Sequence, residues 1–139
     1  MGNNGMVRTV AAILGVALVG AGLLGFIGNP IVGPGPNNNG TDVLFAANSV
    51  HNIVHLVTGA LALYIAFGLS GVQQANALLG FGILYVVIFV AVLFSPTLLG
   101  LFDPIPANMP LHLLHAGLAV VGIGVGYMAR GSTASVSTR

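Results

Sequence analysis

One apolar stretch with polar residues at its start constrains this chain more than any other. It runs from Asn48 to Leu69 and reads NSVHNIVHLVTGALALYIAFGL. A helix needs about 20 apolar residues to cross the hydrocarbon core of a bilayer, so this stretch is long enough to span one. At about 100° per residue its polar and small residues share one helix face: Asn48, His51, Asn52, His55, Gly59, Ala62 and Ala66. Because polar groups are costly against lipid, we expect a second helix to cover this face.

The composition predicts an integral membrane protein. Hydrophobic residues make up 56% of the 139 residues and charged residues only 4%, whereas soluble domains carry roughly a quarter charged residues. We therefore expect a multi-pass protein of the cell membrane, whose partners are the lipid bilayer and either other membrane proteins or further copies of this chain. Three basic and two acidic residues provide no patch for nucleic acid.

The absence of cysteine restricts the available chemistry. Disulfides, thiolate metal sites and covalent haem attachment through cysteine are excluded. The side-chain ligands that remain for a metal are histidine, aspartate and asparagine.

Four apolar segments predict an all-α bundle of four transmembrane helices in a single domain, residues 1–139. The predicted spans are residues 9–27, 48–69, 76–98 and 110–128, and residues 70–75 are expected to form a short turn. Gly28 to Ala47 and Phe102 to Pro110 are rich in proline, glycine and asparagine, which predicts two long loops. The Ser/Thr-rich residues 130–139 are expected to form a disordered polar tail.

The charges predict the orientation. Arg8, Arg130 and Arg139 lie near the two ends of the chain, while Asp42 and Asp103 lie in the two long loops. The positive-inside rule then places both termini in the cytoplasm and both long loops outside. Asn39-Gly40-Thr41, in the first of these loops, matches the N-glycosylation acceptor pattern, although an asparagine-rich turn that ends in threonine would read the same way.

The last span repeats a feature of the second. Asn48 precedes His55 by seven residues, and Asn108 precedes His115 by seven, so the two histidines should lie at similar depth below the outer face. His112 shares a helix face with His115, and His51 shares one with His55. We expect these four histidines to converge between the second and fourth helices. Small residues are expected to allow close helix packing: Gly15, Gly22, Gly59, Gly122 and Gly126.

Several runs in the chain resemble an uncharacterised family of small four-helix membrane proteins, domain-of-unknown-function family 4383. The most specific runs are GLLGFIG (22–28), NSVHNIVHLVTG (48–59) and LHAG (114–117), and the resemblance extends from Arg8 to about Gly126. The family has an Asp-Asn pair before the histidine equivalent to His115, whereas this chain has Leu111 and His112 there. The resemblance implies a membrane bundle and brings no activity with it.

The sequence leaves several functions open for the histidines. A structural or accessory subunit of a membrane assembly would use them in a His/Asn hydrogen-bond network that joins the second and fourth helices. A binding protein would use His51, His55, His112 and His115 for Zn, Cu, Ni or a haem. A proton path, a pH sensor and a small transporter or channel subunit are also compatible with the sequence. The supporting shell of a hydrogen-bond network or a metal site would be Asn48, Asn52, Asn108 and Thr58.

The chain shows no motif for catalysis. We find no nucleophile motif, phosphate-binding loop or paired carboxylates among the predicted elements. We therefore predict that it is not an enzyme.

Overall fold

A computed structural model describes residues 3–134 as four long helices with two loops between them. The helices are α1 (Asn3–Leu24), α2 (Ser49–Gly68), α3 (Gly71–Phe94) and α4 (Met109–Ala134). Each is long and apolar enough to cross a membrane, which indicates a membrane protein. The loop after α1 contains two short strands, β1 (Val32–Gly33) and β2 (Phe45–Ala46), that pair in parallel.

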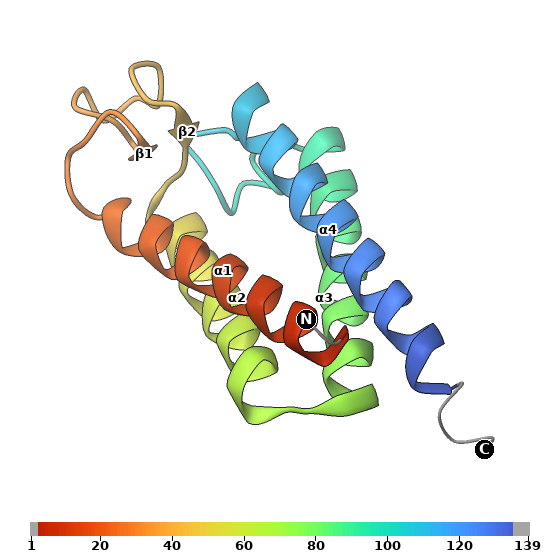
Figure 1. Cartoon of the computed structure of the whole chain (residues 1–139). Helices are drawn as coiled ribbons and strands as arrows, with labels where there is room; N and C mark the ends of the chain where they lie inside the picture. Colours follow the sequence, from red (N-terminus) through yellow and green to blue (C-terminus); the bar gives the residue numbers. More distant parts are fainter. Residues whose placement is uncertain (1–2, 135–139) are drawn as a thin grey trace.

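The helices form two pairs (Figure 1). α1 packs along α2, and α3 packs along α4, while contacts between the two pairs are much less extensive. The first loop and the connection between α3 and α4 lie at one end of the bundle. The start of α1, the turn between α2 and α3 and the end of α4 lie at the other end. α2 and α4 therefore both begin at the end that carries the long loops.

The ends of three helices differ from the predicted spans. α1 begins at Asn3 and ends at Leu24 rather than at residue 27. It ends there because the Asn29 side chain donates hydrogen bonds to the carbonyls of Leu24, at 2.7 Å, and of Val32, at 3.0 Å. α3 ends at Phe94, since Pro96 disfavours helical geometry at Ser95. α4 continues to Ala134, six residues past the predicted end, because no proline interrupts it. Residues 135–139 of the predicted tail lie outside the described residues.

Residues 71–75, predicted as part of a turn, belong to α3. Gly71 starts this helix with a φ of 57°, a left-handed conformation that suits glycine and permits a sharp reversal after Ser70. The buried Gln74 side chain then donates two hydrogen bonds of 2.9 Å, to the carbonyls of Ile65 and Ala66 near the end of α2. Gln74 thus satisfies carbonyl groups at the end of α2 that would otherwise need water as a partner, and it does so across a short turn.

Small residues pack the helices within each pair rather than between α2 and α4. A Cβ added to Gly59 of α2 would lie 2.7 Å from the Val19 backbone nitrogen of α1. A Cβ added to Gly122 of α4 would lie 2.7 Å from Cα of Gly82 in α3. Gly15 and Gly22 similarly adjoin α2, and Gly126 adjoins α3. The seams therefore join α1 to α2 and α4 to α3, because backbones can approach closely where no side chain intervenes.

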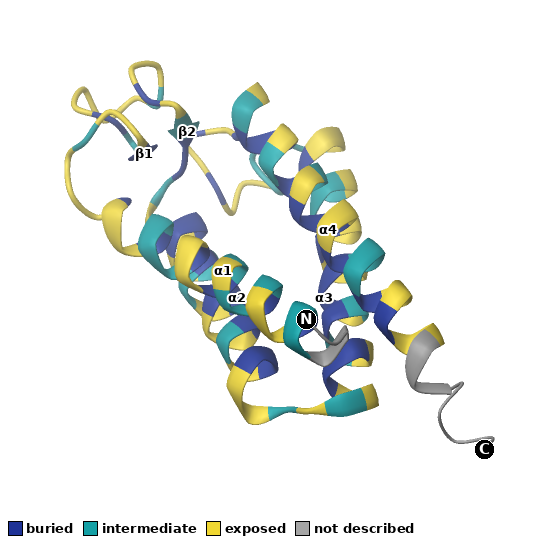
Figure 2. Ribbon diagram, viewed as in Figure 1, coloured by how far each residue is buried: buried dark blue, intermediate teal, exposed yellow. Residues whose placement is uncertain are grey.

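Buried residues lie on the helix faces that point to the centre of the bundle (Figure 2), and many of the exposed residues are large and apolar. Phe94 is 84% exposed, Phe67 69% and Tyr127 70%. Such a surface would be unfavourable in water over so large an area. It suits contact with lipid or with another apolar protein surface.

Side-chain hydrogen bonds connect the two loops to the residues that precede α2 and α4. Asn108, the residue before α4, accepts a hydrogen bond from the backbone of Ala46, at 3.2 Å, and donates to the carbonyl of Leu44, at 2.9 Å. Asn48, the residue before α2, donates to the carbonyls of Leu101 and Asp103, both at 3.2 Å. The loops thus form a cap over the ends of α2 and α4, where the histidines begin.

Candidate metal centre

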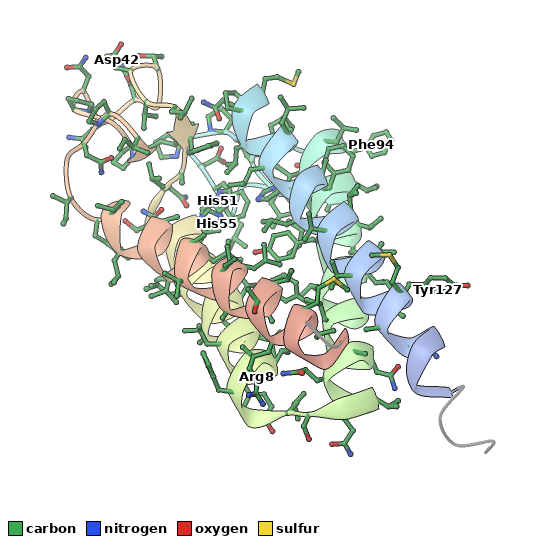
Figure 3. The ribbon with its side chains drawn as sticks, viewed as in Figure 1. Arg8, Asp42, His51, His55, Phe94 and Tyr127 are labelled. Carbon is green, nitrogen blue, oxygen red and sulfur yellow. The ribbon has the colours of Figure 1, made fainter. Side chains whose placement is uncertain are left out.

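Three of the four predicted histidines meet inside the loop end of the bundle. His51 and His55 come from successive turns of α2, and His115 comes from α4. One ligating ring atom from each lies within 4.8 Å of the others, and each residue is 1% exposed. The ring centroid of His51 lies 4.7 Å from that of His55 and 5.6 Å from that of His115. Figure 3 shows His51 and His55 side by side between the two helix pairs, below the loops.

Two local features of the sequence bring the histidine rings together, the spacing along α2 and the caps at the starts of α2 and α4. Positions i and i+4 of a helix lie on one face, so His51 and His55 point the same way from α2. The Asn48 side chain accepts a hydrogen bond of 2.9 Å from the His51 backbone N–H and so fixes the start of α2. Asn108 does the same for α4 through the Leu111 N–H, at 3.3 Å. Equal spacing from the two caps brings His55 and His115 to within 6.3 Å, centroid to centroid, although the α2 and α4 backbones belong to different pairs.

The ring nitrogens in the cluster are largely without hydrogen bonds. Within the described part of the chain, Nδ1 of His51, Nδ1 of His115 and both ring nitrogens of His55 are buried and have no partner. Leaving a buried polar atom unpaired costs about 1–3 kcal/mol. Four such atoms in one place are therefore available to bind a ligand.

Aromatic residues that the sequence did not single out enclose the cluster on two sides. Phe102, in the loop between α3 and α4, stacks on His51 with a centroid distance of 4.3 Å and an interplanar angle of 12°. Tyr85 of α3 lies 5.9 Å from His115, centroid to centroid, and its hydroxyl bonds to that of Thr58 at 2.9 Å. The sequence around an aromatic residue in a proline-rich loop does not indicate which residue it will contact, so the stacking of Phe102 on His51 was not predictable. In the sequence, Tyr85 stands out only because it and Asn76 are the strongly polar residues of the predicted span 76–98.

The remaining predicted site residues lie around the cluster rather than in it. His112 is 8% exposed and lies about one turn before His115 on α4, outside the group of three. Asn52 is fully buried against Gly25, which follows the end of α1, and neither its Oδ1 nor its Nδ2 has a partner among the described residues. Thr58 bonds back to the Val54 carbonyl as well as to Tyr85. Asn48 and Asn108 act as helix caps and do not reach the rings.

The three imidazoles fit the ligand set of a transition-metal ion. Tetrahedral coordination with metal–nitrogen bonds of about 2.0–2.1 Å separates ligand nitrogens by about 3.4 Å. The three ring atoms, all within 4.8 Å of one another, would need to close by about 1.4 Å or less, which small side-chain rotations can supply. Three protein ligands leave a fourth position open for water or another molecule.

The predicted glycosylation acceptor lies in the first loop and does not belong to this cluster. Asn39 is exposed in the first loop, where its Oδ1 accepts hydrogen bonds from the backbone N–H and the hydroxyl of Thr41, at 3.0 and 2.7 Å. In the same loop the Asn37 amide donates a hydrogen bond to the Asp42 carboxylate. Figure 3 shows Asp42 at the loop end and Arg8 at the opposite end of the bundle.

Comparison with known proteins identifies a family. Residues 8–128 match the model of a family described as Domain of unknown function (DUF4383). Since the match covers most of the chain, the protein belongs to this family, as the sequence resemblance suggested. Neither the curated proteins nor the solved structures contain a match.

Proposed function

We propose that this member of the DUF4383 family is a membrane protein that binds one transition-metal ion, Zn or Cu, between His51, His55 and His115. The proposal rests on the buried group of three imidazoles, with ligand atoms within 4.8 Å of one another and four ring nitrogens without a partner. Neutral imidazole is a good ligand for both metals. Ionisable side chains inside a membrane bundle are costly and are usually retained for a function.

The charge of the site bears on which species it would hold. The only acidic residues of the chain, Asp42 and Asp103, lie in the two loops, and neither belongs to the group of three histidines. Three neutral ligands would leave the full charge of a divalent ion inside an apolar bundle, which is unfavourable. We therefore propose that a divalent ion binds together with an anion such as hydroxide at the open position, or that a monovalent copper ion binds alone.

A structural network and a haem site have less support than a metal ion. In a hydrogen-bonded His/Asn network between α2 and α4 the ring and amide atoms would bond to one another. Several of these atoms are instead buried without partners among the described residues. A haem held by two histidines would need a slot as wide as a porphyrin between them. The His51 ring lies within 5.6 Å of the other two rings and is stacked on Phe102, so a single ion fits the arrangement better.

The composition and the distribution of charged residues support a place and an orientation in the cell. We propose that it is a multi-pass protein of the cell membrane, with both termini in the cytoplasm and the metal site near the outer face. Its exposed apolar faces suit lipid, a partner subunit or another copy of the chain.

The test is metal analysis of the purified full-length protein and four single variants, each with histidine replaced by glutamine. We expect the wild-type protein to hold about one metal ion per chain after growth with added zinc or copper. His51→Gln, His55→Gln and His115→Gln should each weaken binding by more than about 100-fold, since even the loss of a group that only supports a ligand costs 10–100-fold.

His112→Gln is the matched control. It removes a histidine from the same region of α4 and should keep the ion, because His112 lies outside the group of three. Circular dichroism and gel filtration in detergent identify any variant that fails to fold. A wild-type protein that folds but retains no more metal than the three variants would overturn the proposal.

A further inference from the structure

A groove in the apolar surface between α1 and α4 leads to the histidine cluster. Its volume is about 320 Å³, at the lower end of the range of small-molecule sites. α1 forms one wall, with Gly20 and Ala21 among its residues, and Leu114 and Leu118 of α4 form the other. Phe45 closes the end near the loops.

Among the described residues that line the groove, His55 alone has a polar side chain. It is 1% exposed, and both of its ring nitrogens lack a partner. A neutral imidazole has one N–H donor and one acceptor nitrogen. The groove therefore brings an apolar surface and one free hydrogen-bonding group to the same place.

The rim of the groove indicates from where it is reached. Val16 is 65% exposed, Ile31 49% and Leu24 43%, and all three line the groove. These apolar side chains lie in or next to a helix that is long enough to span a membrane. A molecule dissolved in the hydrocarbon of the bilayer can enter without crossing a polar surface.

We infer that this groove binds a neutral, lipid-soluble molecule whose head is a carbonyl group, the class to which membrane quinones belong, with the carbonyl oxygen accepting a hydrogen bond from the ring N–H of His55. None of the described residues that line the groove is charged, so an ionic head would be buried without a counter-charge from them, which is strongly unfavourable. A purely apolar molecule would leave the His55 N–H unpaired. The inference goes beyond metal binding and does not require it, because His55 can donate through one ring nitrogen whether or not the other is bound to an ion.

The test uses histidine side-chain NMR on the full chain in lipid nanodiscs. Only four histidines are present, so ¹⁵N-histidine labelling gives a small set of ring signals that single substitutions assign. The probe is 2-decyl-1,4-benzoquinone, and decylbenzene, which has the same tail and no oxygen, is the comparison. Because the chain has no cysteine and no lysine, the quinone has no thiol or lysine amine with which to react.

We expect saturable shifts of the His55 ring signals with the quinone in protein freed of metal by a chelator. Decylbenzene should bind about fivefold more weakly, the equivalent of one net hydrogen bond, and should not produce the shift of a hydrogen-bonded ring nitrogen. Equal affinity for the two probes, or no saturable shift, would overturn the inference.

Two glycine variants test the location. Gly20 lines the groove, and a Cβ added there meets no atom within 4 Å, so Gly20→Leu should fill the groove without disturbing the packing and weaken quinone binding at least about tenfold. Gly117→Leu is the control, since Gly117 has the same open surroundings on α4 and does not line the groove. It should bind as the wild type does. Unchanged quinone affinity in a folded Gly20→Leu variant would contradict the groove as the site.

The metal content of the same samples separates this inference from the proposed function. Gly20→Leu should retain the ion while losing the quinone. A protein that binds the quinone at His55 but never retains metal would contradict the metal proposal and leave the groove assignment standing.

Discussion

Replacing Gly82 of α3 by alanine should open the contact between α3 and α4. A Cβ at this position would lie 2.7 Å from the carbonyl carbon of Gly122, a backbone atom that cannot rotate away. Carbon atoms pack best at about 3.5–4.0 Å, so the two helices must separate locally by about 1 Å. The separation would also loosen the contact of Gly126 with Leu79 one turn further on. Overpacking of this kind costs about 1–3 kcal/mol, and we expect the upper part of this range because the obstacle is backbone.

The matched control is Gly80→Ala, two residues earlier on the same helix. A Cβ there meets no atom within 4 Å, and alanine favours a helix by up to about 1 kcal/mol over glycine. Unfolding by sodium dodecyl sulfate, followed by circular dichroism in mixed micelles, measures both variants against the wild type. Equal unfolding midpoints for Gly82→Ala and Gly80→Ala would refute the close backbone contact between α3 and α4.

Two further predictions concern the turn between α2 and α3 and the orientation of the chain. Gln74→Leu should lower the free energy of unfolding by about 1–3 kcal/mol, because it leaves the carbonyls of Ile65 and Ala66 unpaired; the exposed Gln73→Leu is its control, and equal losses in the two would contradict the role given to Gln74. A cysteine introduced at the exposed Asn38 should react with a membrane-impermeant reagent in intact cells, whereas one at the exposed Gln73 should not; the reverse pattern would show that the long loops are cytoplasmic.

The four helices were predictable because each is a long run of apolar residues, and length and hydropathy suffice to find a membrane helix. The ends were less predictable, because they depend on particular side chains. Asn29 donates a hydrogen bond to the carbonyl of Leu24, the last residue of α1, and Gln74 donates to carbonyls near the end of α2 across a short turn. Neither interaction leaves a periodic pattern in the sequence.

The histidine cluster was predictable in part for a similar reason. The i, i+4 spacing of His51 and His55 and the equal distance of His55 and His115 from their capping asparagines are local features of the sequence. The choice of helix neighbours is not local. Gly59 and Gly122 identify helix faces that another helix can approach closely, but they do not specify which helix that is. In the structure Gly59 packs against α1 and Gly122 against α3.

The position of His112 follows from that arrangement. Its spacing of three from His115 allowed it to join the cluster, but among the described residues the histidine rings of α2 meet the ring of His115 on α4, and His112 lies outside this group. The stacking of Phe102 on His51 then covers the side nearest the loops.

X-ray absorption spectroscopy at the K-edge of the bound metal reports directly on the ligands of the three-histidine site. For the wild-type protein in detergent, we predict three imidazole nitrogens at about 2.0–2.1 Å for zinc, with a fourth light-atom ligand, and the same spectrum for His112→Gln. A shell of nearest neighbours made only of oxygen atoms, or one whose imidazole signal falls when His112 is replaced and persists when His55 is replaced, would contradict metal binding by His51, His55 and His115.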